Sequence, residues 1–180
     1  MPLLSAADLQ QRAARIRLAC FDVDGTLTDG RLYFGAEGEL AKAFHVHDGQ
    51  GLRLLEDHGI AVALITARDS AAARARGEDL RLRHVHTGIK DKRACLDEIC
   101  AELGLSLDQV AYYGDDLPDL PALSVVGLAC APANAHAWIR EQAHWISRER
   151  GGEGAARELC DLILEAQGWR DAILLRYRDA

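Results

Sequence analysis

Apolar runs and helical segments alternate along most of the chain. The run that begins at Leu18 ends at Asp22, and a second run over 60–65 lies between Gly59 and Thr66. Continuous apolar runs of this length are typical of strands that are buried on both faces of a sheet. The pattern predicts strands that end at Asp22 and lie over 60–65, 84–86, 110–113, 125–129 and 144–146. It predicts helices over 6–16, 49–58, from Asp69 or Ser70 to Leu80, 91–103, 117–123, 135–142 and 155–167.

Alternating strands and helices of these lengths predict an α/β fold, a Rossmann-like doubly wound parallel sheet with helices on both faces. No repeat, low-complexity segment or linker interrupts the pattern, so we expect a single domain over residues 1–180. In such folds ligands bind beyond the carboxyl ends of the strands. Residues that follow strands are therefore the first candidates for function.

Two segments depart from this alternation. Residues 31–34 and 41–46 read as two short strands around Gly35-Ala36-Glu37-Gly38, which predicts a β-hairpin flap at 31–46. Near the C-terminus, the glycine-rich stretch over 151–154 predicts flexibility before the last helix. The tail from Trp169 to Ala180 is apolar and basic, and the pattern does not place it.

Composition narrows the function classes. The 180 residues carry a net charge of −7, which argues against a general nucleic-acid binder. The five cysteines form no Cys-x-x-Cys pair, so neither a disulfide framework nor a zinc knuckle is expected, and reduced thiols of a cytoplasmic protein are the better interpretation. No apolar run approaches the ~20 residues of a membrane helix, and polar residues interrupt any signal-peptide core at the N-terminus.

Chemistry is concentrated at the end of the first predicted strand. Asp22 and Asp24 alternate along the chain, so both carboxylates leave the strand tip on one side. Two carboxylates held together repel each other unless a cation or a shared proton relieves them. Gly25 lets the backbone turn close to a ligand. The segment therefore predicts a place to hold Mg²⁺ and a phosphate group.

Polar residues at other strand ends complete a phosphoryl-transfer site. Taken alone, Thr66 could cap a helix, Lys92 could be a solvated lysine, and Asp115 could belong to a loop. Together they supply what the reaction needs. Asp22 would be the attacking oxygen and a metal ligand, and Asp24 would protonate the leaving alcohol and then activate water. Asp115 and the Asp24 carbonyl would complete the Mg²⁺ ligands, and Thr66 and Lys92 would hold the phosphate.

These residues resemble the haloacid-dehalogenase superfamily of aspartate-nucleophile phosphatases. Over about 16–168 the chain resembles the phosphatases that act on 3-deoxy-D-manno-octulosonate 8-phosphate. The resemblance implies a Mg²⁺-dependent cytoplasmic hydrolase of a sugar-acid phosphate in lipopolysaccharide core synthesis, with no membrane or nucleic-acid partner. The matching segments are DVDGTLTDG from Asp22 to Gly30, Tyr33-Phe34-Gly35, Lys42-Ala43-Phe44, His47-Asp48-Gly49, Ile65-Thr66-Ala67-Arg68, Lys92, Gly114-Asp115-Asp116-Leu117-Pro118-Asp119 and GGEGAARE from Gly151 to Glu158.

The resemblance also implies substrate contacts and an assembly. It implies no large cap domain, and a homotetramer in which the hairpins contribute and subunits cover each other's sites. It further implies that the stretch over 151–154 closes over a neighbouring site, with Arg157 nearby. His45 and His47 stand where an amide and an arginine are common. The substrate-binding set is Asp24, His45, Val46, His47, Asp48, Gly49, Arg53, Arg68, Arg76 and Lys92.

Three alternatives remain at this point. One is a phosphatase of a nine-carbon ulosonic acid 9-phosphate, since sugar length is set by pocket shape. Another is a catalytically silent phosphatase-like domain that serves oligomerisation. A third is a response-regulator receiver, but receivers place adjacent acids after the first strand, and here the adjacent pair Asp115 and Asp116 comes late.

Overall fold

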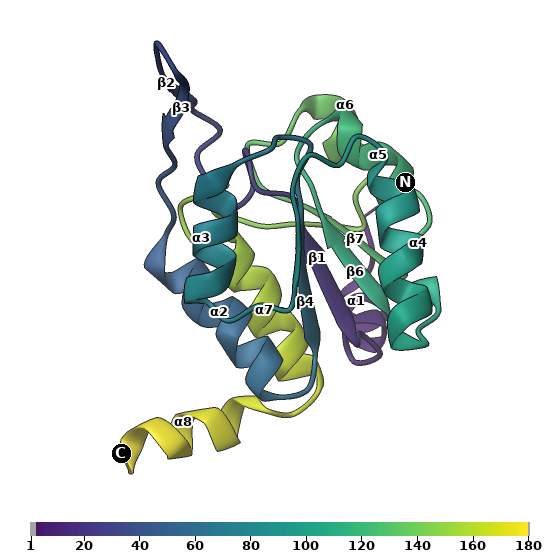
Figure 1. The fold of residues 1–180 in the computed structure, drawn as a ribbon. Coiled ribbons are helices and arrows are strands. Elements are labelled where there is room, and N and C mark those ends of the chain that lie inside the picture. The colour runs from purple at the N-terminus through teal and green to yellow at the C-terminus, as the bar shows by residue number, and fades with distance from the viewer. Residues whose placement is uncertain (1–2, 180) are drawn as a thin grey trace.

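A six-stranded sheet forms the centre of the molecule in the computed structural model, which describes residues 3–179 (Figure 1). Every neighbouring pair in the sheet is parallel, and the order is β5-β4-β1-β6-β7-β8. The predicted α/β fold is therefore confirmed. Residues 1–2 and Ala180 of the expected domain lie outside the described residues. The sheet strands are β1 (Leu18–Phe21), β4 (Ala61–Ile65), β5 (His84–His86), β6 (Val110–Tyr113), β7 (Leu128–Ala131) and β8 (Trp145–Ile146).

Helices cover both faces of this sheet. Alternate strand residues face opposite sides, so Phe21 and Tyr113 pack into one apolar cluster and Cys20 and Tyr112 into the other. The first cluster includes residues of α1, α2, α3 and α7, and the second includes residues of α4, α5 and α6 (Figure 1). The helices are α1 (Ala6–Ala13), α2 (Val46–Asp57), α3 (Ala71–Asp79), α4 (Lys92–Leu103), α5 (Leu120–Leu123), α6 (Ala137–Arg140), α7 (Ala155–Ala166) and α8 (Arg170–Arg178), with short 3₁₀ turns at Leu107–Gln109 and Leu117–Asp119.

The three central strands end at the same level. Phe21 on β1 is in register with Leu64 on β4 and with Tyr113 on β6. The chain order reverses around β1, because β4 and β5 lie on one side of it and β6 to β8 on the other. This is the position where open α/β sheets bind ligands. Residues that follow β1, β4 and β6 therefore emerge at one edge.

The hairpin forms, but its second strand was predicted too late. Its strands are β2 (Tyr33–Gly35) and β3 (Gly38–Ala41), and they pair with each other and not with the main sheet. The apolar alternation over 41–46 suggested a strand, whereas α2 already begins at Val46, three residues before its predicted start. His45 is the N-cap of α2, and its ring accepts a hydrogen bond from the His47 N–H (3.2 Å). The hairpin projects from the body of the fold (Figure 1).

One further strand lies later in the chain than predicted, and the C-terminal tail is helical. The strand predicted at 125–129 lies at Leu128–Ala131, because the Gly127 N–H donates to the Leu107 carbonyl (2.8 Å) and holds the preceding residues outside the sheet. The tail that the sequence did not place forms helix α8, which extends beyond the end of α7 (Figure 1).

All five cysteines are free and buried, as expected. Across residues 3–179, no helix has both the length and the apolar character to cross a bilayer.

The glycine-rich stretch over 151–154 packs against the loop that follows β1. The Gly152 N–H donates to the Thr26 carbonyl (3.0 Å), and a Cβ added at Gly151 would lie 1.8 Å from the Gly25 carbonyl oxygen. Only glycine permits so close an approach of two backbones. The stretch therefore fixes one side of the loop that carries Asp22 and Asp24.

Candidate active site

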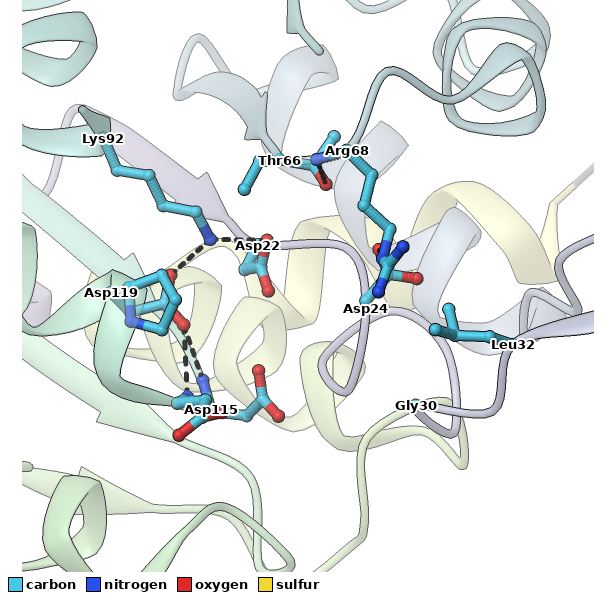
Figure 2. Close-up of a pocket in the computed structure, with 12 residues that line it drawn as sticks. Asp22, Asp24, Gly30, Leu32, Thr66, Arg68, Lys92, Asp115 and Asp119 are labelled. Atoms are coloured by element: carbon cyan, nitrogen blue, oxygen red, sulfur yellow. Dashed lines mark hydrogen bonds and ion pairs between the residues drawn. The ribbon is translucent and has the colours of Figure 1, made fainter. Parts of the chain in front are cut away.

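A cavity of about 350 Å³ opens beyond the carboxyl ends of β1, β4 and β6 (Figure 2). It brings together the residues that the sequence placed at the strand ends. The predicted site residues that line it are Asp22, Asp24, Thr66, Arg68, Lys92 and Asp115, and the other lining residues are Gly30, Leu32, Ala67, Asp116, Pro118 and Asp119. We call Asp22, Thr66, Lys92, Asp115 and Asp119 the strand-end cluster.

Lys92 joins two carboxylates of this cluster. Its ammonium lies 2.7 Å from Asp22 Oδ1 and 2.7 Å from Asp119 Oδ1, and the residue is only 3% exposed. Lys92 is the first residue of α4, whose N-cap Asp91 accepts a hydrogen bond from the Ala94 N–H (2.9 Å). Burial alone would lower the pKa of Lys92, but the two carboxylates outweigh it and raise that pKa. Lys92 is thus a fixed positive charge in the cavity and not a solvated lysine.

Asp119 is a site residue to which the sequence analysis gave no role. Its Oδ1 accepts hydrogen bonds from Lys92 and from the buried Tyr112 hydroxyl (3.1 Å). Its Oδ2 accepts from the backbone N–H groups of Asp115 (3.0 Å) and Asp116 (3.3 Å). The 3₁₀ turn at Leu117–Asp119 returns this carboxylate beneath the loop that carries Asp115. The only signal in the sequence was its place at the end of the Gly114–Asp119 motif.

Three carboxylates of the cluster converge closely enough to hold a metal ion. One oxygen each of Asp22, Asp115 and Asp119 lies within 4.8 Å of the others. Each oxygen of Asp119 accepts two hydrogen bonds from the protein. Asp22 and Asp115 are therefore the better ligands for a metal ion. Gly25 makes room for the second of these, because a Cβ at that position would lie 2.1 Å from Asp115 Oδ2. Carboxylate oxygens are the donors that Mg²⁺ prefers, so the residues fit this ion.

The pKa values of Asp22 and Asp115 agree with a cation site. Burial, reinforced by the charge of Asp119 and opposed by Lys92, raises the pKa of Asp22 to about 7. Burial and the charges of Asp22 and Asp119 raise the pKa of Asp115 to about 8. A divalent cation between them would stabilise both ionised forms. The nucleophilic form of Asp22 would therefore depend on such an ion at neutral pH.

Thr66 emerges directly after β4 on the same edge. It is buried, its N–H donates to the His86 carbonyl (2.9 Å), and its Oγ1 accepts from the Arg68 N–H (3.3 Å). The hydroxyl of Thr66 can donate to a phosphate oxygen in the cavity. The Thr26 hydroxyl has a different task, because it donates to the Asp22 carbonyl and so fixes the turn after β1.

Asp24 lies on the opposite side of the cavity from Lys92, beside Arg68 (Figure 2). Its Oδ2 is 3.6 Å from Arg68 Nε, and its Oδ1 is paired with the ammonium of Lys42, which follows β3. Asp22 and Asp24 thus reach the same cavity but have different cationic partners. The sequence analysis quoted Lys42 within a motif and gave it no role.

The remaining predicted substrate-binding residues do not line this cavity. They surround the N-terminus of α2 and the facing part of α3. Four of them line a separate, smaller cavity of about 10 Å³ together with Leu27, Phe44, Leu52 and Leu80, and these four are His45, Asp48, Gly49 and Arg76. Arg76 pairs with Asp79 (2.6 Å), and Arg53 donates to the Leu80 carbonyl (2.8 Å). We call His45, Val46, His47, Asp48, Gly49, Arg53 and Arg76 the α2 group.

Asp48 is the most buried titratable member of the α2 group. Its Oδ1 accepts a hydrogen bond from the Arg157 N–H in the first turn of α7 (2.8 Å), and its Oδ2 has no hydrogen-bond partner. Burial raises its pKa, although the hydrogen bond from the Arg157 backbone opposes the change. Within one chain Asp48 therefore caps α7, whose own N-cap, Gly154, has no side chain.

Comparisons with known proteins agree with this geometry. The sequence model of the haloacid dehalogenase-like hydrolase family matches residues 84–159. The chain is 47% identical over 162 residues to the 3-deoxy-D-manno-octulosonate 8-phosphate phosphatase of Yersinia pestis, an alignment that covers 90% of this chain and 87% of the relative.

Two solved structures are similar over nearly the whole chain. A hypothetical protein from Xanthomonas campestris is 62% identical with a TM-score of 0.93, and the match covers 98% of this chain and 99% of that one. A 3-deoxy-D-manno-octulosonate 8-phosphate phosphatase from Moraxella catarrhalis, solved with a magnesium ion, a phosphate ion and the sugar acid, is 39% identical with a TM-score of 0.93 and covers 96% and 99%.

Proposed function

The chain belongs to the 3-deoxy-D-manno-octulosonate 8-phosphate phosphatases within the haloacid dehalogenase-like hydrolases, and from this premise we propose that it hydrolyses that sugar-acid phosphate with Mg²⁺. It is a phosphoric monoester hydrolase. The observation that carries the proposal is the approach of Asp22, Asp115 and Asp119 within 4.8 Å beside the buried Lys92. This arrangement holds a nucleophile, metal ligands and a cation at one point.

The reaction proceeds in two steps on the residues of the cavity. An Asp22 carboxylate oxygen attacks phosphorus, and the bond between phosphorus and the sugar oxygen breaks as Asp24 gives that oxygen its proton. Asp24, now ionised, then takes a proton from a water molecule that attacks the aspartyl phosphate, which releases phosphate and restores Asp22. Lys92 and the Thr66 hydroxyl hold the phosphate oxygens on which negative charge is concentrated.

The residues that would hold Mg²⁺ are Asp22 and Asp115, through their carboxylates, and Asp24, through its main-chain carbonyl. The bound ion supplies positive charge to the phosphate oxygens and to Asp22. Arg68 stands at the rim of the cavity, half-exposed beside Asp24, where a guanidinium can pair with a substrate carboxylate.

We further propose a cytoplasmic homo-oligomer, a tetramer by resemblance, in which the α2 group reaches the cavity of a neighbouring subunit. The hairpin supports this, because Phe34 is 58% exposed, Leu40 71% and the nearby Val46 72%. Exposed apolar side chains on and beside a projecting hairpin favour a protein interface. Sedimentation velocity measures the assembly directly.

A phosphate-release assay tests the proposed function. The substrates are 3-deoxy-D-manno-octulosonate 8-phosphate, a nine-carbon ulosonic acid 9-phosphate and glucose 6-phosphate, each with Mg²⁺ and with a chelator. We expect the highest kcat/KM for the eight-carbon substrate, lost with the chelator. Faster release from the nine-carbon ester would assign the other sugar acid, and no release from any ester would indicate a silent domain. If the eight-carbon substrate is preferred, as we expect, the sugar acid that is released would enter lipopolysaccharide core synthesis.

A further inference from the structure

Lys42 is a buried lysine that the proposed reaction has not used. Its side chain is only 1% exposed, although it follows an exposed hairpin strand. A lysine is rarely buried without partners, because removing an ammonium from water is costly. Lys42 has two such partners: it pairs with Asp24 Oδ1, and its Nζ lies 2.9 Å from Glu39 Oε2.

Glu39 connects this lysine to the rigid part of the fold. Its Oε1 accepts a hydrogen bond from the Ser70 hydroxyl (2.6 Å). Ser70 is buried and is the N-cap of α3, where its Oγ also accepts from the Ala73 N–H (3.2 Å). Lys42 is therefore held from two sides, by a carboxylate anchored at α3 and by Asp24 in the cavity.

This arrangement distinguishes the two oxygens of Asp24. Lys42 donates to Oδ1, whereas the nearest cation to Oδ2 is Arg68 Nε at 3.6 Å. An ammonium has N–H donors and no acceptor, so Asp24 Oδ1 must be the acceptor in the pair with Lys42. The pairing with Lys42 therefore fixes the position of Oδ1 and limits rotation of the carboxyl group.

We propose that Lys42 is a positioning residue for Asp24, through which the hairpin orients the acid that protonates the departing sugar oxygen. The inference rests on the proposed function, because it requires Asp24 to act as that acid. Lys42 is not among the residues that line the cavity, so its effect passes through Asp24. A lysine that only tied down the hairpin would have the same effect on every substrate.

The dependence on the leaving group separates these two roles. Loss of the sugar alcohol needs a proton, whereas p-nitrophenolate leaves without one. The ratio kcat/KM reports the steps up to the first irreversible one, which is phosphoryl transfer to Asp22 with loss of the alcohol. General acid catalysis contributes a factor of about 100 or more, so we expect Lys42→Ala to lower kcat/KM about 100-fold for 3-deoxy-D-manno-octulosonate 8-phosphate. For p-nitrophenyl phosphate, which needs no acid, we expect a loss of less than about threefold.

Two variants and one control complete the test. Lys42→Arg, which keeps the donor, should recover about tenfold of the loss, and Glu39→Gln, which removes one partner of Lys42, should lower the sugar-phosphate value about threefold. Lys90→Ala removes an exposed lysine outside this network and should leave both substrates unchanged. If Lys42→Ala does not fold, Glu39→Gln still reports the leaving-group pattern.

Equal losses of kcat/KM on the two substrates in Lys42→Ala, or no loss on either, would overturn the positioning role of Lys42. The proposed function would still stand in that case, provided that the wild-type protein is active on the sugar phosphate. Failure of Lys42→Arg to exceed Lys42→Ala would also overturn the positioning role. A wild type that releases no phosphate from either ester would overturn the proposed function together with this inference.

Discussion

The strand-end cluster and the α2 group are built in opposite ways. The strand-end cluster gathers at the carboxyl ends of three adjacent strands, with Lys92 from the start of α4, and its carboxylates, lysine and hydroxyl meet in one cavity. The α2 group comes from α2, the residue before it and the facing part of α3, and only Asp48 and Gly49 within it are buried. All members of the first group that would hold metal and phosphate in the proposed reaction come together within one chain. In the proposed oligomer, a neighbouring subunit would bring the second group to that cavity.

The largest expected effect removes the nucleophile from the strand-end cluster. Asp22→Asn should reduce phosphate release by several orders of magnitude with every ester, because an amide cannot form the aspartyl phosphate. The fold and the oligomer should persist, since the amide keeps the size of the side chain. Steady-state kinetics with circular dichroism measures both. Asp29→Asn, outside the cavity, is the matched control, and equal activities in the two variants would remove Asp22 from this role.

The next effect tests whether the α2 group acts across subunits. Arg76→Ala should lower kcat/KM for the sugar-acid phosphate about 10- to 100-fold, because a charge-assisted contact to the substrate is lost. Co-expression of Arg76→Ala chains with Asp22→Asn chains should yield more activity than the sum of the separate variants. Mixed oligomers then contain sites with an intact nucleophile and an intact neighbouring arginine.

Arg83→Ala serves as the control for this experiment, since Arg83 is exposed and pairs with Glu102 away from the cavity. Activity of the mixed sample that merely equals the sum would place Arg76 outside any neighbouring site.

A smaller effect concerns metal and pH. The pKa of Asp22 is about 7 and that of Asp115 about 8 in the folded chain, above the ~4 of an unfolded carboxyl group. Between those values the folded state binds more protons than the unfolded state, so stability without metal should fall as pH rises from about 5 to about 8. Mg²⁺ competes with these protons and should raise Tm by several degrees, more at pH 8 than at pH 6.

Calorimetry of the metal-free protein with and without Mg²⁺ measures this dependence. The double variant Asp22→Asn, Asp115→Asn should lose both the slope and the response to Mg²⁺. A Tm that rises with pH over this range without metal would contradict the account of these two carboxylates.

The smallest effect compares two adjacent buried tyrosines. The Tyr112 hydroxyl donates to Asp119, whereas the Tyr113 hydroxyl pairs with Ser147 (2.8 Å) on the other face of the sheet. Tyr112→Phe should lower kcat about three- to tenfold because Asp119 holds Lys92 less firmly, while Tyr113→Phe should change stability alone, each hydrogen bond contributing roughly 1 kcal/mol. Kinetics and thermal melts of both variants decide it, and equal kcat values in the two would contradict a role for Tyr112.

The sequence predicted the part of the site that depends on strand ends. Asp22, Thr66 and Asp115 each follow a strand that an apolar run marks, and parallel strands bring their ends together, so their convergence was predictable. Asp119 was missed because its role depends on a 3₁₀ turn that returns the chain beneath Asp115. Lys42 was missed because its approach to Asp24 depends on tertiary contacts of the hairpin, in which Glu39 binds both Lys42 and the Ser70 hydroxyl at the N-cap of α3.

The start of α2 was misplaced for a related reason. Residues 41–46 alternate in a way that resembles a strand, and a histidine is an uncommon N-cap. The position of β7 was shifted because Gly127 binds the backbone of Leu107, a contact that is distant in the sequence. Local pattern thus located the elements, and tertiary contacts set their ends and the second layer of the site.

A crystal structure of the protein with Mg²⁺ and beryllium fluoride tests the central claim most directly, because this anion mimics a phosphoryl group bound to a carboxylate. We predict beryllium bonded to an Asp22 oxygen, Mg²⁺ between Asp22 and Asp115, and the fluorides in contact with the Thr66 hydroxyl and the Lys92 ammonium. An adduct on another carboxylate, or a Mg²⁺ ion bound away from both aspartates, would contradict the account.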